Sequence, residues 1–386
     1  MQISGLKVLL LQDTTNYAGT EAHVLTLAKN LAKHTAVSPV IGTTAGGELH
    51  RRCAAANVPY HVLPKSPGMF NLAGMIAAAA MLRNREVDVI HAHNGRTSLV
   101  ANCAKLLTRR GKVVLTQHFI EPDYVNRKGI AGRLAGLVHR FILTNVDQHI
   151  CISEAVRNGF LDRQEQGVVA PESVHIVQNG IDDVYESLDK LECRERILSE
   201  LNLLQETRLV LCVARLEPEK DVQALLRSVS KIVSSIPFHC VIVGDGSERS
   251  RLEMLVRYTK VQDKVTFLGF RNNVPSIMKA SDIFVLPAPA EPFGLVVVEA
   301  MMAALPVVAI ANGGPSEIVV NDQTGFLVPA DDIQALSFAV KKLVNDTSKC
   351  LTMGTYGQRR AKAAYSSEVM ANNTCNVYAL CGHKGQ

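Results

Sequence analysis

The sequence predicts an α/β protein made of two doubly wound, Rossmann-like domains. Short apolar runs rich in β-branched residues alternate with helix-length segments, and they fall into two sets separated by a charged stretch at residues 182–207. Runs of this kind are typical of parallel strands covered by helices on both faces. A chain of 386 residues is also longer than one hydrophobic core usually organises.

Ten apolar runs are the expected strands, five in each half of the chain. We place the domain boundary near residue 187, giving domains at 1–187 and 188–365, with a C-terminal helix at about 366–386 that packs back on the first domain. The runs are KVLLL (7–11), SPVIG (38–42), VDVIHAH (87–93), KVVLTQH (112–118), QHICIS (148–153), RLVLCVA (208–214), HCVIVGDG (239–246), KVTFLG (264–269), DIFVLP (282–287) and LPVVAI (305–310).

Composition excludes several classes of protein. The net charge of +5 is small and the basic residues are dispersed, which argues against a nucleic-acid partner. Nine scattered cysteines without a Cys-x-x-Cys pair argue against a disulfide framework or a zinc–cysteine site, and favour a reducing cytoplasm. The longest apolar stretch, Leu72–Leu82, is far shorter than the roughly 20 residues that cross a bilayer.

Chemistry in open parallel sheets is expected just after the strands. Arg215 and Lys220 follow the run at 208–214 and precede an amphipathic helix, so two cations near a helix N-terminus suggest a diphosphate site. By themselves, an isolated Arg and Lys are better explained as solvated surface charges. Gly244 and Gly246 permit a sharp strand-to-helix turn, a signal that is weak alone.

The segment APAEPFGLVVVEAMM carries two carboxylates in an otherwise apolar stretch. Glu291 lies in the loop after the strand at 282–287, and Glu299 lies inside the following helix. Gly294 permits close approach of a ligand, and the first amides of the helix are free to donate to phosphate oxygens. Two carboxylates around a phosphate cradle suit a ligand with hydroxyl groups at both ends, such as a nucleotide sugar. A purely structural alternative is that Glu291 caps the helix and Glu299 faces the solvent.

In this order the motifs resemble the retaining glycosyltransferases of family 4, which have the GT-B fold. Beyond Arg215, Lys220 and the two glutamates, they include NYAGTEAHVLTLAKNL (16–31), HAH (91–93), TQHF (116–119), VQNGID (177–182), VGDG (243–246), FLGF (267–270) and GGPSEIV (313–319). The resemblance covers nearly the whole chain. It departs in one loop, where Ala18-Gly19 stands in place of the family's frequent Gly-Gly.

The resemblance implies a nucleotide-sugar donor held by the second domain, an acceptor held by the first, and transfer with retention of configuration. Glu299 is then expected to bind the ribose, and His118 to contact the transferred sugar. The catalytic set is His118, Arg215, Lys220 and Glu291; the donor-binding set is Gly19, Gly244, Phe293, Gly294, Leu295 and Glu299; and the acceptor side has Asn16 and His93.

We expect no metal ion and no cofactor besides the nucleotide sugar, because Arg215 and Lys220 supply positive charge and the sequence has no Asp-x-Asp. His91 and His93 lie on one face of their strand, as two metal ligands do, but the sequence shows no third ligand nearby, which favours a structural or acceptor-side role. His118 reads equally as a hydrogen-bonded histidine at a strand end until the resemblance is considered.

The sequence also bears on four other functions. A nucleotide-sugar 2-epimerase shares the fold, and a non-catalytic nucleotide-sugar sensor would keep the same residues. A dehydrogenase requires Gly-x-Gly-x-x-Gly after the first strand, and the chain has QDTTNYAGTEAH there. A glycosidase requires its two carboxyl groups to flank one bond, whereas here a phosphate cradle separates them.

A basic, apolar segment, NRKGIAGRLAGLVHRFIL (126–143), has the composition of a helix that lies on an anionic membrane. The cations are Arg127, Lys128, Arg133 and Arg140. Most such helices are ordinary surface helices packed on their own sheet, and the sequence favours that explanation. Membrane contact at the inner face would suit an acceptor that is a cell-envelope polysaccharide, a lipopolysaccharide, or another glycan or lipid-linked sugar.

Overall fold

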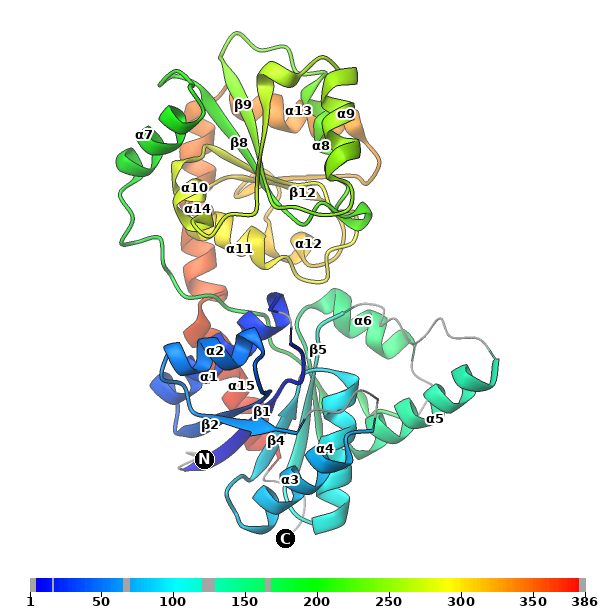
Figure 1. Ribbon diagram of the computed structural model, residues 1–386. Coiled ribbons are helices and arrows are strands. Elements are labelled where there is room, and N and C mark those ends of the chain that lie inside the picture. Colours follow the sequence, from blue (N-terminus) through cyan, green and yellow to red (C-terminus); the bar gives the residue numbers. More distant parts are fainter. Residues whose placement is uncertain (1–4, 16, 65–69, 120–128, 164–167, 382–386) are drawn as a thin grey trace. The chain divides into compact units, whose positions relative to one another are not determined.

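Two compact α/β units make up the chain (Figure 1). The computed structural model describes residues 5–15, 17–64, 70–119, 129–163 and 168–381, without the side chains of 129–134. Unit 1 consists of Met1–Ile181 and Ser367–Gln386, and unit 2 of Asp182–Ser366. Each unit is built on one parallel sheet with helices against it, so the predicted fold class is confirmed.

The described part of unit 1 contains a seven-stranded parallel sheet in the order β3-β2-β1-β4-β5-β6-β7. Its strands are β1 (Leu6–Leu11), β2 (Val37–Thr44), β3 (Tyr60–Leu63), β4 (Val89–Ala92), β5 (Lys112–Gln117), β6 (Gln148–Cys151) and β7 (Val174–Ile176). Its α-helices are α1 (Gly19–His34), α2 (Glu48–Ala55), α3 (Leu72–Arg83), α4 (Gly95–Thr108), α5 (Gly129–Asn145), α6 (Glu154–Asp162) and α15 (Ser367–Leu380).

Unit 2 contains, within the described residues, a six-stranded parallel sheet in the order β10-β9-β8-β11-β12-β13. Its strands are β8 (Arg208–Val213), β9 (Phe238–Val243), β10 (Val265–Gly269), β11 (Ile283–Leu286), β12 (Val307–Ile310) and β13 (Gly325–Val328). Its α-helices are α7 (Lys190–Glu200), α8 (Val222–Val229), α9 (Arg249–Tyr258), α10 (Val274–Ala280), α11 (Leu295–Met302), α12 (Pro315–Ile318), α13 (Ile333–Val344) and α14 (Thr347–Ala364).

Three strands were missed by the sequence analysis, and all three are edge strands. β3 and β7 close the two sides of the first sheet, and β13 closes one side of the second. They have three or four residues each, and the first three residues of β3 are exposed. An edge strand is short and often half-solvated, so it lacks the continuous apolar run that identifies a central strand.

The boundary between the units lies at Ile181–Asp182, earlier than the expected position near residue 187. The charged stretch begins with residues that pack into unit 2: Tyr185 is fully buried there, and its hydroxyl lies 3.2 Å from the Met278 sulfur. The last helix, α15, belongs to unit 1 and packs against α1. Tyr378 of α15 reaches the sheet, where its hydroxyl is 2.7 Å from Nδ1 of His91.

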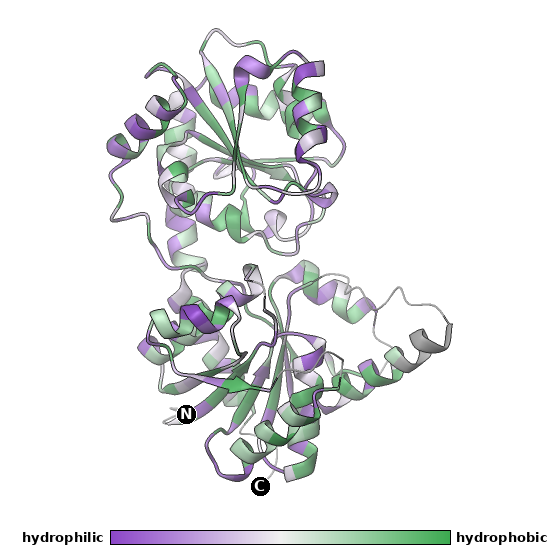
Figure 2. Cartoon of the chain, in the orientation of Figure 1, coloured by the Kyte–Doolittle hydropathy of each residue, from purple (hydrophilic) through white to green (hydrophobic). Residues whose placement is uncertain are grey.

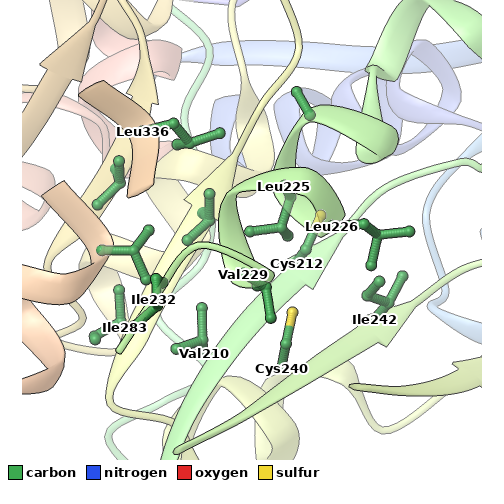
Figure 3. Packing of buried hydrophobic residues seen from close by; sticks show 14 of the residues in the cluster. Val210, Cys212, Leu225, Leu226, Val229, Ile232, Cys240, Ile242, Ile283 and Leu336 are labelled. Atoms are coloured by element: carbon green, nitrogen blue, oxygen red, sulfur yellow. The ribbon is translucent and has the colours of Figure 1, made fainter. Parts of the chain in front are cut away.

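The core of unit 2 shows why the strand ends are held firmly (Figure 3). Leu225 and Val229 of α8 and Leu336 of α13 lie against β8, β9 and β11 in one cluster of buried side chains. Each fully buried aliphatic side chain of this kind contributes about 1.5–3 kcal/mol to the free energy of unfolding. Figure 2 shows the apolar strands inside each unit and polar residues on the outer faces of the helices. The loops at the strand ends therefore start from rigid positions.

Candidate active site

The loops of unit 2 that carry the predicted donor-binding residues emerge at one edge of the sheet. β9, β8, β11 and β12 are adjacent and parallel, so their carboxyl ends share that edge. Arg215 follows β8, Gly244 follows β9, Glu291 follows β11 and Gly313 follows β12. The topology thus places all four loops side by side.

Lys220 and Glu291, predicted separately, form an ion pair. Lys220 ends a short 3-10 turn before α8, and its Nζ donates to Oε2 of Glu291 at 2.6 Å. Both side chains are largely buried, with 18% and 16% of their surface exposed. Arg215 is different: it is 67% exposed and pairs with Glu219 at 2.8 Å. Lys220 is therefore held in a largely buried ion pair, whereas Arg215 lies at the surface in an exposed one.

Three glycines allow the loop backbones to touch. At Gly313 φ is +64°, and a Cβ atom there would lie 2.2 Å from the carbonyl oxygen of Glu291. A Cβ at Gly314 would lie 2.2 Å from the carbonyl oxygen of Phe293, and the Gly314 amide donates to the Glu291 carbonyl at 2.9 Å. At Gly244 a Cβ would lie 1.9 Å from the Ala214 carbonyl oxygen. Only glycine fits such contacts, so these residues set the shape of the edge.

The N-terminus of α11 offers backbone donors beside the ion pair. Gly294 is its N-cap with φ of +94°, and no side chain caps the helix. The first amides of an α-helix have no acceptor within the helix, and for Leu295 none is found elsewhere in the described residues. The Phe293 ring is buried and packs edge-on against Tyr365, with ring centres 6.0 Å apart. This arrangement suits the oxygens of a phosphate group.

Glu299 has no compensating partner, in contrast to Glu291. It lies half-buried on α11, and burial raises the pKa of its carboxyl group to about 7. Within the described residues its side chain makes no hydrogen bond or ion pair. A desolvated carboxylate without a donor gains the most from a ligand that brings hydroxyl groups.

Unit 1 has its own cluster at the carboxyl ends of β1, β4 and β5. Glu21, the third residue of α1, accepts from the Ala18 amide at 2.8 Å and from Nε2 of Gln12 at 2.7 Å, which fixes the loop before the helix. Asn94, the N-cap of α4, donates to Oε1 of Gln12 at 2.9 Å. Gly19 is the exposed first residue of α1, and Asn16 lies outside the described residues.

The predicted histidines are buried here, and they have different partners. Nδ1 of His93 lies 3.2 Å from Nε2 of His118, so the two predicted site histidines are in contact. His91 is structural, because its two nitrogens are 2.7 Å from the hydroxyls of Tyr378 and Thr116.

The sequence shows no third ligand near the HAH motif, but the structure brings His23 beside His93 and His118. His23 of α1 packs edge-on against both His93 and His118, with ring centres 5.4 and 5.0 Å away. Sequence reasoning missed it because its neighbours are far away in the chain. Its position one turn into α1 was the available signal, because that turn faces the same sheet edge. Gln12 and Asn94 directly follow strands and were available in the same way.

Comparison with known proteins decides the family. Residues 194–360 match the family model "Glycosyl transferases group 1", and residues 17–185 match "Glycosyltransferase Family 4". The chain belongs to glycosyltransferase family 4. The resemblance to family 4 inferred from the motifs is therefore confirmed. The protein is an enzyme, a glycosyltransferase.

Two curated relatives extend this result. The chain is 26% identical to an N-acetyl-alpha-D-glucosaminyl L-malate synthase of Bacillus anthracis, over 83% of this chain and 81% of the relative. It is also 26% identical to a UDP-Gal:alpha-D-GlcNAc-diphosphoundecaprenol alpha-1,3-galactosyltransferase of Escherichia coli, over 72% and 71%. Neither is an epimerase, so these relatives lend that alternative no support.

Solved structures confirm the GT-B fold. Anabaena Alr3699/HepE, in complex with UDP and glucose, superposes with a TM-score of 0.80 at 22% identity, covering 97% of this glycosyltransferase and 99% of that chain. WaaG, a glycosyltransferase involved in lipopolysaccharide biosynthesis, superposes with a TM-score of 0.70 at 16% identity, covering 98% and 100%.

Gly313→Ala tests whether the glycine contacts shape the site. The added Cβ must push the Glu291 carbonyl away, so we expect donor affinity to fall at least about tenfold, since a displacement near 1 Å is enough to cost this much. Gly357→Ala, within α14, is the control, because its nearest contacts would be Met301 Cγ at 3.5 Å and the Leu305 carbonyl oxygen at 3.8 Å, both ordinary van der Waals distances. Affinity is measured by calorimetric titration with the donor, and equal affinities in both variants would contradict the assignment.

Proposed function

We propose that this glycosyltransferase moves a sugar from a nucleoside diphosphate sugar to a hydroxyl acceptor, with retention of configuration and without a metal ion. The observation that carries the proposal is the edge of the second sheet. There the Lys220–Glu291 pair, the glycine contacts and the N-terminus of α11 lie at the same sheet edge and offer a cation and backbone donors to a phosphorylated ligand, with Glu299 further along the helix. The UDP and glucose of the HepE complex are ligands of that chemical kind.

The site residues of unit 2 have separate roles in this proposal. Lys220 and Arg215 stabilise the negative charge that develops on the diphosphate as it leaves, together with the amides of Gly294 and Leu295. Glu291, already held by Lys220, accepts hydrogen bonds from the sugar. Glu299 accepts hydrogen bonds from the ribose, which supply the partners that its buried carboxylate lacks.

The acceptor and the reactive end of the donor are assigned to unit 1. His118 is proposed to contact the transferred sugar, and Gly19 to let the first loop approach the diphosphate. Asn16 and His93 are proposed to serve the acceptor. The acceptor class is a cell-envelope glycan or a lipid-linked sugar, supported by the diphosphoundecaprenol substrate in the name of the E. coli relative.

The decisive experiment is a screen of UDP-, GDP- and ADP-sugars by thermal shift, followed by transfer with the best donor. We expect one donor class to stabilise the protein, and the product to keep the donor's anomeric configuration by NMR. Activity in excess EDTA should be no lower than activity without it. An inverted product would refute retention, loss of activity in EDTA would refute metal independence, and donor binding without transfer to any acceptor would favour a sensor.

Replacing the cations tests the diphosphate site. Lys220→Ala and Arg215→Ala should each lower kcat/KM for transfer by about a hundredfold or more, because each removes a charge directed at the leaving group. Lys341→Ala, an exposed lysine on α13, is the control and should leave the rate unchanged. Initial rates with the identified donor measure the effect, and native rates in both site variants would remove the diphosphate role.

The two carboxylates should separate binding from turnover. Glu299→Gln should mainly weaken donor binding, whereas Glu291→Gln should mainly lower kcat, since the ribose is remote from the reacting carbon. Because the raised pKa of Glu299 lies at about 7, donor affinity should increase from pH 6 to pH 8 as the carboxylate ionises. The increase should be absent in Glu299→Gln. Titrations at each pH give the affinities, and an identical pH profile in that variant would contradict the ribose role.

Peripheral membrane contact is proposed for α5. Its Ile142 and Leu143 are buried, Leu137 is 64% exposed and Arg140 is exposed, while Arg127, Lys128 and the side chain of Arg133 lie outside the described residues. In the part of the chain that the structure describes, no helix is long and apolar enough to cross a bilayer. An exposed apolar residue beside cations is the pattern of a helix that binds anionic lipid surfaces.

Sedimentation with anionic liposomes tests this contact. We expect binding at low salt that disappears at high salt, and loss of binding when Arg127, Lys128, Arg133 and Arg140 are changed to Gln. The matched control changes four exposed cations of unit 2, Arg227, Arg251, Arg257 and Lys260, to Gln. Binding that depends on the control set, or no binding at low salt, would leave a dissolved acceptor as the better proposal.

A further inference from the structure

Three buried imidazoles converge in unit 1. Ring nitrogens of His23, His93 and His118, one from each, lie within 4.8 Å of one another. The side chains come from the first turns of α1 and from the residues directly after β4 and β5, so the sheet edge brings them together. They are only 6%, 2% and 7% exposed.

Hydrogen bonding within the protein does not satisfy this cluster. Nε2 of His93 is buried without a hydrogen-bond partner. No hydrogen bond of good geometry reaches either ring nitrogen of His23, although the Asn179 side chain lies close enough to raise its pKa. The bond between His93 and His118 uses one nitrogen of each ring. A buried polar atom without a partner costs about 1–3 kcal/mol. Native proteins rarely leave several such atoms together, and an ion bound by one nitrogen of each ring would complete one nitrogen of His23.

We propose that His23, His93 and His118 form a binding site for a divalent transition-metal ion of the zinc class. Three neutral imidazoles and one open position are a common zinc ligand set. In a tetrahedral site with Zn–N distances of 2.0–2.1 Å, two ligand nitrogens lie about 3.3 Å apart. The His93–His118 distance of 3.2 Å fits that spacing. The proton now between these rings moves to the far nitrogen of its own ring by a change of tautomer.

The ligand type decides which class of ion suits the cluster. Mg²⁺ and Ca²⁺ prefer oxygen ligands, whereas imidazole suits zinc, cobalt, nickel and copper.

The surroundings hold the rings in position. His91 stacks on His93 with ring centres 4.3 Å apart, and His91 itself is fixed by Tyr378 and Thr116. Glu21 anchors the start of α1 two residues before His23. Neighbours that fix the orientation of ligand side chains strengthen metal binding.

The site has a consequence that rests on the proposed function. An ion there occupies the nitrogen with which His118 is proposed to contact the sugar, so zinc should inhibit transfer although transfer needs no metal. Ion binding itself is measured without donor or acceptor. Failure of the metal site and failure of the sugar-transfer proposal are therefore distinguishable.

Titration of the full-length, EDTA-treated protein tests the site. Zn²⁺ is added in competition with a chromophoric chelator, and Co²⁺ is added in parallel for its visible spectrum. We expect one ion per chain and the intense absorption of four-coordinate Co²⁺. His23→Gln should weaken Zn²⁺ binding by more than about a hundredfold, since loss of a ligand exceeds the 10–100-fold cost of losing an outer neighbour. His149→Gln, another buried histidine of unit 1, should leave it unchanged.

Circular dichroism establishes that each variant is folded. His118→Gln is prepared as a second site variant, because His118 is the most exposed of the three ligands, at 7%. Its loss should also abolish Zn²⁺ binding, so the test does not depend on His23→Gln alone. Absence of Zn²⁺ binding to the native chain, binding that survives both site variants, or a weak six-coordinate Co²⁺ spectrum would each overturn the proposal.

Discussion

Parallel strand pairing is the constraint on which the rest of this structure depends. In each unit all the described strands run in the same direction, so every loop that follows a strand emerges at the same edge. Residues far apart in the sequence, such as Lys220 and Glu291, therefore meet without any long-range signal in the chain. The buried cores beneath the strands then decide how accurately they meet, because close-packed interiors permit little movement.

The carboxyl-terminal edges of the two sheets differ in the charge that they carry. In unit 2 Lys220 and Glu291 form a short, largely buried ion pair, and burial raises the pKa of Glu299 to about 7. In unit 1 the histidines respond to burial by staying neutral. Desolvation disfavours any charged form, so a charge survives there only with a partner. A charged edge suits a phosphorylated leaving group, and a neutral edge suits hydroxyl groups or a soft metal ion.

The fold was predictable from sequence where strands are central and apolar. Nine of the ten predicted strands are central strands, and the tenth, β10, is an edge strand that keeps an apolar run. The edge strands β3, β7 and β13 were missed because an edge strand can be short and partly solvated. The boundary was misplaced because Tyr185, one buried aromatic in a charged stretch, does not change the local pattern. The sequence names Arg215, Lys220, Glu291 and Glu299 as site candidates because a motif orders them, and the structure brings Lys220 and Glu291 into contact. The roles of these residues stay predictions.

His23 shows why the remaining part of a site escapes sequence reasoning. Nothing local distinguishes it from a histidine on any amphipathic helix, and its meaning comes only from the rings of His93 and His118 beside it. The spacing in HAH suggested two ligands on one strand, yet His91 is taken by Tyr378, a residue 287 positions away. Strand spacing fixes the face on which a side chain lies, but the partner available on that face depends on how distant segments pack. Through Tyr378, the last helix, α15, thus gives His91 a structural role, whereas His93 belongs to the cluster at the edge of the sheet.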